Sequence, residues 1–456
     1  MIFQYTLSKA YSILSSSMSE QTDLFEQAKN VLKQNDRGLY TIPAHGLYPH
    51  QWLWDSCFTA LGWRHIDIER AKMEILSLLR GQWKNGMIPH MVFTPGRNYQ
   101  RDHNIWRSWV SPFAPDDVFT SGVTQPPMLA EAIVRIGEKL PLVERRSWYR
   151  QVYEPLLQYH LWLYADRDPH GEGLTLQIHP WETGLDNSPP WMSELHEHLL
   201  PWWIRLLRKT HLETVTGWFR RDTRFVPREQ RFSNTDALAL YDAQRRLRRK
   251  AYDIDKILDH SLFAIEDLAF NCILIRANEH LLQIAKSIRA EVPVELLKSI
   301  EQTHKTLEEL WDPYTEQYYS RDFVTHKLIK VPSIASLLPL YAGTITKERA
   351  ATIVKTLENE HIFGPPYPVP SAPLNSPWFN ADRYWQGPTW FNTNWLIIDG
   401  LRRYGYKDHA EALTEVSLEL VKDGHFNEYF NPLSGKPLGA PNFSWTAAIT
   451  IDWLKS

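Results

Sequence analysis

Segments with the periodicity of amphipathic helices follow one another along almost the whole chain, and this pattern restricts the fold more than any other feature. Apolar residues recur at three- and four-residue spacings in about a dozen segments, whereas the strict alternation of strands is scarce. The segments are fairly evenly spaced, as in helices that pack in pairs. The helices that we expect cover residues 23–35, 68–81, 128–139, 144–166, 192–209, 237–252, 254–287, 293–311, 332–341, 347–358, 389–404, 409–422 and 444–453.

Loops rich in glycine and proline separate these segments, and no low-complexity linker divides the chain. About a dozen helices without a break favour an all-α fold, a single (α/α)6 barrel. We expect the barrel to span residues 20–456, with loops and short β-hairpins over a pocket at one end. The candidate strands are residues 317–320, 323–330 and the neighbours of Phe93. We expect residues 1–19 to be a disordered N-terminal extension.

The charge and cysteine content exclude several classes of function. A net charge of −3 gives no electrostatic signature for nucleic acid or an anionic membrane, and no apolar run reaches the ~18 residues of a membrane span. The lone Cys57 and Cys272 form neither a disulfide framework nor a zinc site, which fits a reducing cytoplasm. Phosphate-binding and dinucleotide motifs are also absent. We therefore expect a small-molecule partner, no metal and no cofactor, and leave open whether the chain forms a homo-oligomer.

The aromatic content is the unusual part of the composition, with 20 Trp and 20 Tyr. These side chains combine a flat apolar face with a polar group, which suits the C–H faces and hydroxyls of sugar rings. An aromatic-rich core is the competing explanation for any single Trp. Several Trp, however, stand beside carboxylates in loop segments, and such clusters favour a carbohydrate site.

One loop, residues 179–191, places Glu182 and Asp186 four positions apart among Gly, Pro and Trp. A carboxyl group against Trp in a partly dry pocket has a raised pKa, which a general acid needs at neutral pH. The alternative is that Asp186 only forms a turn. Glu428 precedes Tyr429, Phe430 and a Pro/Gly turn, so it is either a surface acid or a partly buried one.

Three further clusters lie at junctions between loops and helices. Asp55 follows two Trp and could cap a helix or accept hydrogen bonds from vicinal hydroxyls. Gln125, just before two prolines, is open to the same two interpretations. Tyr384 and Trp385 precede Gly387, and they are typical of an aromatic platform for a ring.

Six blocks, taken in order, resemble family 63 of the glycoside hydrolases, and more narrowly its bacterial mannosylglycerate and glucosylglycerate hydrolase branch. The blocks are HQWLWDS, GQWKNGMIPH, TSGVTQPP, HPWETGLDNSP, YWQGPTW and EYFNPLSG with NFSWTAA. They span about residues 40–450, nearly the whole chain, and six ordered blocks are far more specific than one.

The resemblance implies an (α/α)6 barrel that hydrolyses short α-glucosides or α-mannosides with inversion, from the chain end of the substrate. It implies Asp186 as the general acid that protonates the glycosidic oxygen. Glu428 would be the general base that activates water on the opposite face of the sugar. The residues that the resemblance places around the sugar are Tyr48, Trp52, Trp54, Asp55, Trp181, Glu182, Tyr384 and Trp385.

The sequence says less about the identity of the leaving group, the part of the substrate that is released from the sugar. Pro190-Trp191-Met192 departs from the family pattern, and the loop 94–102 has no match. In the basic run Arg220, Arg221, Arg224, Arg228 and Arg231, the first two are candidates to hold a carboxylate such as glycerate, unless the run is a solvated face. A trehalase-like or glucan-trimming α-glucosidase is the main alternative. A sugar epimerase on the same barrel is another, although it would be expected to use histidine pairs.

Overall fold

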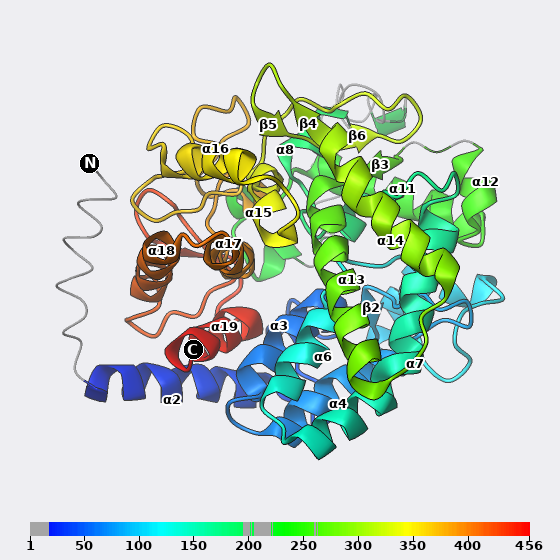
Figure 1. The fold of residues 1–456 in the computed structure, drawn as a ribbon, viewed down its shortest axis with the longest axis horizontal. Helices are drawn as coiled ribbons and strands as arrows, with labels where there is room; N and C mark the ends of the chain where they lie inside the picture. Colours follow the sequence, from blue (N-terminus) through cyan, green and yellow to red (C-terminus); the bar gives the residue numbers. More distant parts are fainter. Residues whose placement is uncertain are drawn as a thin grey trace.

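The computed structural model describes residues 18–194, 201, 203–204, 220, 222–259, 261 and 263–456. Within these ranges, helices alternate along the chain between an outer and an inner layer (Figure 1). The inner helices are α3 (Leu53–Trp63), α6 (Leu129–Glu138), α13 (Leu268–Ile288), α15 (Pro339–Ala342), α17 (Phe391–Arg403) and α19 (Ser444–Leu454). The outer helices are α2 (Met18–Asn35), α4 (Ile68–Leu79), α7 (Leu142–Arg167), α14 (Val294–Thr306), α16 (Lys347–Glu358) and α18 (Lys407–Glu419).

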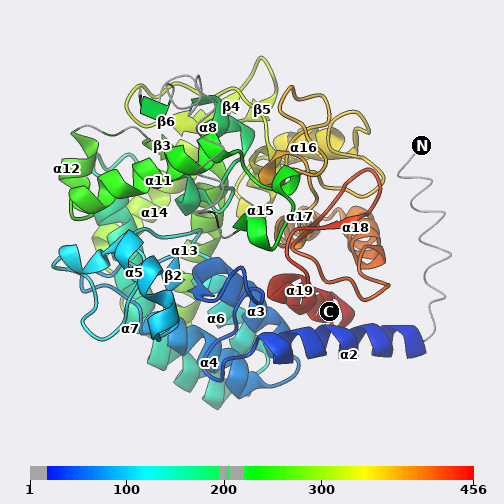
Figure 2. The same cartoon turned by 180° about the vertical axis from the view of Figure 1, so that it is seen from behind.

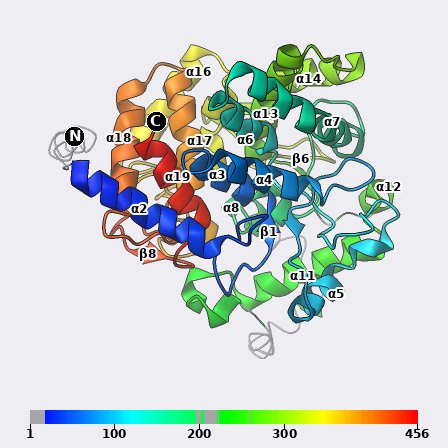
Figure 3. The same ribbon diagram turned by 90° about the horizontal axis from the view of Figure 1, so that it is seen from below.

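Each inner helix packs against the next, and α19 packs against α3, so the ring is closed. The predicted (α/α)6 barrel is therefore confirmed. Figure 3 shows α2 running along α19 beside α3, which brings the first and last described helices together. Close approach of α3 and α19 requires a small residue, because a Cβ on Gly62 would lie 2.5 Å from the Ala448 Cα atom.

The inner helices lack the polar face of the outer ones. Every residue of α3 is buried, whereas α4 has one solvent-exposed face. Helix α4 begins after the N-cap residue Asp67. A buried polar network joins the inner helices to one another. Its members are Arg64 next to α3, Glu131 and Arg135 of α6, His280 of α13, Tyr341 of α15, Asp399 of α17 and Asp452 of α19. Such pairs favour one arrangement of helices more than they add net stability.

Short two-stranded antiparallel sheets lie outside the ring, and the last two of those given below are hairpins. They pair β1 (Gln51–Trp52) with β2 (Met91–Val92), β3 (Ile265–Glu266) with β6 (Arg321–Asp322), β4 (Trp311–Asp312) with β5 (Gln317–Tyr318), and β7 (Tyr429–Phe430) with β8 (Pro437–Leu438). The strand predicted over 323–330 is wrong, because a turn follows β6 at once. Figure 2 shows the side of the molecule with α11 (Asn234–Arg249) and the helix α5 (Gln100–Trp106), which the periodicity missed.

The single helix predicted over 254–287 is also wrong. It is divided into α12 (Ile254–Leu258) and α13, and β3 lies between them. Asp267 forces a new start, because its carboxylate caps α13 by accepting the Phe270 N–H. Residues 1–17, Arg221 and most of the helix predicted over 192–209 lie outside the described residues. No helix in the described ranges is both long and apolar enough to cross a membrane.

Candidate active site

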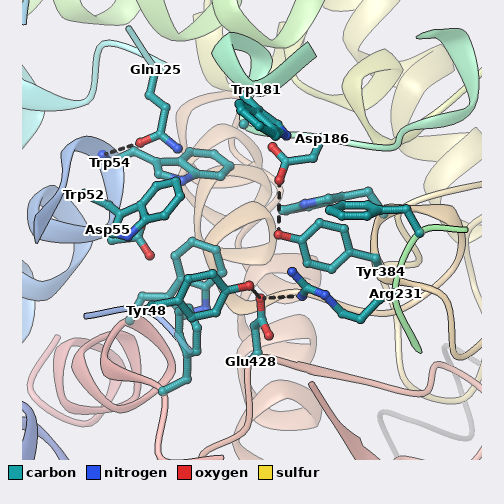
Figure 4. A pocket seen from close by; sticks show the side chains of 15 residues that line it. Tyr48, Trp52, Trp54, Asp55, Gln125, Trp181, Asp186, Arg231, Tyr384 and Glu428 are labelled. Atoms are coloured by element: carbon teal, nitrogen blue, oxygen red, sulfur yellow. Dashed lines mark hydrogen bonds and ion pairs between the residues drawn. The ribbon is translucent and has the colours of Figure 1, made fainter. Parts of the chain in front are cut away.

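A cavity of about 140 Å³ opens where the inner helices begin (Figure 4). Trp54 and Asp55 come from the first turn of α3, and Trp445 comes from that of α19. Asp186 follows the short helix η3 (Pro180–Thr183), and Glu428 directly precedes β7. The lining residues are Tyr48, Trp52, Trp54, Asp55, Gln125, Trp181, Gly184, Asp186, Arg231, Phe232, Tyr384, Trp385, Glu428, Phe443 and Trp445.

Glu428 receives three hydrogen-bond donors. The Tyr48 hydroxyl donates to Oε1 at 2.7 Å, and the Arg231 guanidinium lies 3.4 Å from the same oxygen. The Ala440 N–H donates to Oε2 at 3.0 Å, while the Glu428 N–H donates to the Ala440 carbonyl at 2.9 Å. The hairpin thus fixes both the backbone and the carboxylate of Glu428. Both carboxylate oxygens therefore face donors, and the orientation of the side chain is fixed.

Asp186 has a different environment. Burial raises the pKa of its carboxyl to about 7; the Arg231 cation and a hydrogen bond from Tyr384 oppose this rise, and the charge of Glu428 adds to it. The Tyr384 hydroxyl donates to Oδ2 at 3.2 Å. Gly184 lets the loop that carries Asp186 approach Trp54: its φ is +73°, and a Cβ there would lie 2.7 Å from the indole.

Asp55 and Gln125 are part of the cavity wall, and neither caps a helix. The N-cap of α3 is Trp52, so Asp55 lies in the first turn, and the N-cap of α6 is Met128. Burial raises the pKa of Asp55 well above its usual range, and the charges of Glu428 and Asp186 raise it further. Gln125 accepts a long hydrogen bond from the Trp54 N–H, at 3.5 Å.

Stacked aromatic rings form the wall that carries Tyr384. Trp385 stacks on Trp390, with ring centroids 3.8 Å apart and an interplanar angle of 3°. Tyr384 has a φ of +39°, a strained value for a residue other than glycine. Hydrogen bonds on both sides hold this turn, because Trp390 Nε1 donates to the Tyr384 carbonyl and the Trp385 N–H donates to Asn187 Oδ1. Asn187 therefore ties the loop of Asp186 to the aromatic wall.

A model of the mannosylglycerate hydrolase MGH1-like glycoside hydrolase domain matches residues 48–446. The chain belongs to this glycoside hydrolase family. The mannosylglycerate hydrolase of Thermus thermophilus is 39% identical over 434 residues, which cover 94% of this chain and 100% of that protein. The glucosylglycerate hydrolase of Mycolicibacterium hassiacum is 32% identical, covering 95% of this chain and 98% of that protein.

A solved structure also resembles this family 63 hydrolase over its length. The crystal structure of the family 63 mannosylglycerate hydrolase from Thermus thermophilus, in complex with Tris, has a TM-score of 0.85 and 38% identity. The match covers 94% of this chain and 99% of that one. The predicted family and the predicted enzyme class, a glycosidase, are confirmed.

Two predicted contacts of this glycoside hydrolase need correction. Glu182 does not line the cavity: its fully buried carboxylate pairs with Arg167 at 2.8 Å. Burial raises the pKa of Glu182, and Arg167 opposes the rise. Arg220 also lies outside the cavity lining, since its guanidinium pairs with Asp222 and donates to the Phe232 carbonyl. Each of these side chains points away from the cavity and pairs with another residue of the protein.

The sequence reasoning missed Arg231 as a member of the site. Its guanidinium is buried, lies 4.1 Å from the Tyr384 ring centroid and contacts both Glu428 and Asp222. It is thus the cation between the two candidate catalytic carboxyls in Figure 4. The basic run 220–231 pointed to this region, but nothing in the sequence separates Arg231 from its neighbours. Only the folded chain distinguishes them.

Proposed function

We propose that the chain is an inverting, exo-acting α-glycosidase in which Asp186 is the general acid and Glu428 the general base. The observation that carries this assignment is the contrast between two carboxyl groups that face one cavity. Burial raises the pKa of Asp186 to about 7, so this group carries a proton near neutral pH. Glu428 accepts hydrogen bonds from Tyr48 and the Ala440 N–H and contacts the Arg231 cation, as a carboxylate that serves as a base would.

The geometry suggests how a proton would travel. Tyr384 donates to Oδ2 of Asp186, and the protonated carboxyl would give its proton to the glycosidic oxygen. Glu428 would take a proton from a water molecule as that water attacks the anomeric carbon from the opposite face. Arg231 would stabilise the ionised Glu428 before the attack. No group beyond these side chains and water is needed to balance the reaction.

The remaining cavity residues would hold the sugar. Trp54 and Trp385 supply apolar faces, while Asp55 and Gln125 supply polar groups for the hydroxyls. Asp55, with its raised pKa, can donate a hydrogen bond as well as accept one. Further contacts of this kind would come from Tyr48, Trp52, Trp181 and Tyr384.

We further propose that the substrate is glucosylglycerate or mannosylglycerate. Similarity along the whole chain to a mannosylglycerate hydrolase and to a glucosylglycerate hydrolase supports this choice over a trehalase-like activity. Arg231, the cation in the cavity, already contacts Glu428 and Asp222, so a glycerate carboxylate would be bound elsewhere or would share it.

Proton NMR of the reaction with mannosylglycerate, glucosylglycerate, trehalose and glucosylglycerol tests both proposals. We expect the two α-glycosides of glycerate to be cleaved fastest and the first sugar released to be the β-anomer. A first-formed α-anomer would refute inversion, and preference for trehalose would refute the substrate. Asp186→Asn and Glu428→Gln should each lower turnover about 100-fold or more, and near wild-type turnover in either would remove that residue from the mechanism.

A further inference from the structure

Glu182 connects three segments of the chain although its side chain never reaches the cavity. Oε1 accepts hydrogen bonds from Arg167 Nη2 at 2.8 Å and from the Thr124 N–H at 3.2 Å. Oε2 accepts one from the Ile178 N–H at 2.8 Å. Arg167 ends α7 and its side chain is 3% exposed, while that of Glu182 is 0% exposed. The pair therefore joins the end of an outer helix to two loops of the active site.

These two loops carry groups that face the sugar. Thr124 immediately precedes Gln125, a cavity residue. Glu182 follows Trp181 in η3, and the chain then passes through Gly184 to Asp186. A shift of the Glu182 carboxylate would therefore change the position of the general acid relative to the sugar contacts.

We propose that Glu182 and Arg167 are positioning residues, which hold the Asp186 loop in register with the Gln125 loop. This inference rests on the assignment of Asp186 as the general acid. The acid must lie within hydrogen-bond distance of the glycosidic oxygen, and a displacement of about 1 Å can lower the rate about 100-fold. A buried ion pair with three donors on one carboxylate resists such a displacement, because any shift leaves a buried charge less well paired.

Substitution Glu182→Gln keeps the shape of the side chain and disturbs this junction. An amide has one acceptor oxygen and one NH2 group, so it cannot accept hydrogen bonds on both sides. Either the Ile178 N–H or the Thr124 N–H with Arg167 then faces another donor. The loop is expected to move, and water would reach Asp186 more easily.

The pH profile reports such a movement. The raised pKa of Asp186 comes first from burial, so added water would lower it and move the basic limb of kcat/KM to lower pH. The groups around Asp186 are Arg231, Tyr384 and Glu428, with Asp55 across the cavity, and none of them is altered by the substitution. The double variant Arg167→Met with Glu182→Gln removes both charges, so a direct electrostatic effect on Asp186 largely cancels in it.

The test measures kcat and KM across pH, with unfolding by urea, on the best-cleaved glycoside of the panel. We expect Glu182→Gln and the double variant to lower kcat/KM at least about tenfold and to move the basic limb to lower pH. Asp452→Asn is the matched control: it breaks the buried ion pair with Arg64 (2.7 Å) but does not border the cavity. This variant should lose stability and keep the wild-type limb.

Two results separate this inference from the proposed function. If Asp186→Asn keeps wild-type turnover, the general acid has been misassigned. If Asp186→Asn is inactive but the Glu182 variants keep the wild-type kcat and the wild-type basic limb of the pH profile, the positioning role is refuted. It is also refuted if the Glu182 variants lose activity only in proportion to their loss of stability, as the control does. Should Glu182→Gln not fold, the double variant still decides, because it removes both charges of the buried pair, and only the partly exposed Asp166 loses a contact with Arg167 (3.4 Å).

Discussion

Replacing Asp186 by asparagine should make the protein more stable at alkaline pH while it removes activity. The pKa of Asp186 is raised from an ordinary value of 3.8 to about 7 in the folded state. The native state therefore holds this proton more tightly than the unfolded chain does. Its contribution to stability is complete below pH 3.8 and is lost as the pH rises through about 7. Asparagine does not titrate, so the variant escapes this loss.

The magnitude follows from the difference between the two pKa values. At about 1.36 kcal/mol for each pH step, the wild type has lost about 4 kcal/mol at about pH 8.5 but only about 2 kcal/mol at about pH 5.5. The free energy of unfolding of Asp186→Asn, relative to wild type, should therefore rise by about 2 kcal/mol between these two conditions. Urea titrations of both proteins measure it. A difference that stays constant with pH would show that Asp186 is not a buried acid with a raised pKa.

Five further outcomes are expected at the same site. The basic limb of the wild-type kcat/KM profile should lie near pH 7, since Asp186 must be protonated, and steady-state rates across pH measure it. Glu428→Gln should lower kcat about 100-fold or more with little change in KM. Tyr48→Phe removes one donor to Glu428 and should lower kcat about tenfold. Initial rates measure both effects. Arg231→Met should cost about 3–5 kcal/mol in urea unfolding, because it leaves the buried Glu428 carboxylate without its cation, whereas Asp222 keeps Arg220. Gly184→Ala should lower stability by about 1–3 kcal/mol, because of its positive φ and the approach of Trp54; a thermal midpoint equal to that of wild type would contradict this.

Helix periodicity predicted the outer layer of the barrel better than the inner one. The segment predicted at 347–358 coincides with α16, because a helix with one wet face alternates apolar and polar residues at 3.6-residue spacing. Helix α3, in which every residue is buried, was missed. The break between α12 and α13 was missed because the apolar spacing continues through β3.

In the site, the sequence indicated which residues matter more reliably than where their side chains point. Asp186 stood out through its aromatic neighbours, but Glu428 became a candidate partner only through six ordered blocks. Trp181 lines the cavity, whereas the adjacent Glu182 is directed at Arg167, and residue type and spacing do not determine that difference. Arg231 could not be identified from the sequence, because Glu428, the cavity carboxylate that it contacts, lies far away in the chain.

The closure of the ring between α3 and α19 determines when the proposed pair of catalytic carboxyls can be complete. The hydrogen bond from Tyr48 to Glu428 joins residues 380 positions apart, so it forms only after both ends of the barrel have met. Contacts of such long range cost the most chain entropy and are expected late in folding. During synthesis from the N-terminus, Asp186 and its loops can be in place while Glu428, the proposed base, is still missing. Catalytic activity should therefore appear as the last event of folding. The time at which activity appears then measures when the final helix, α19, docks.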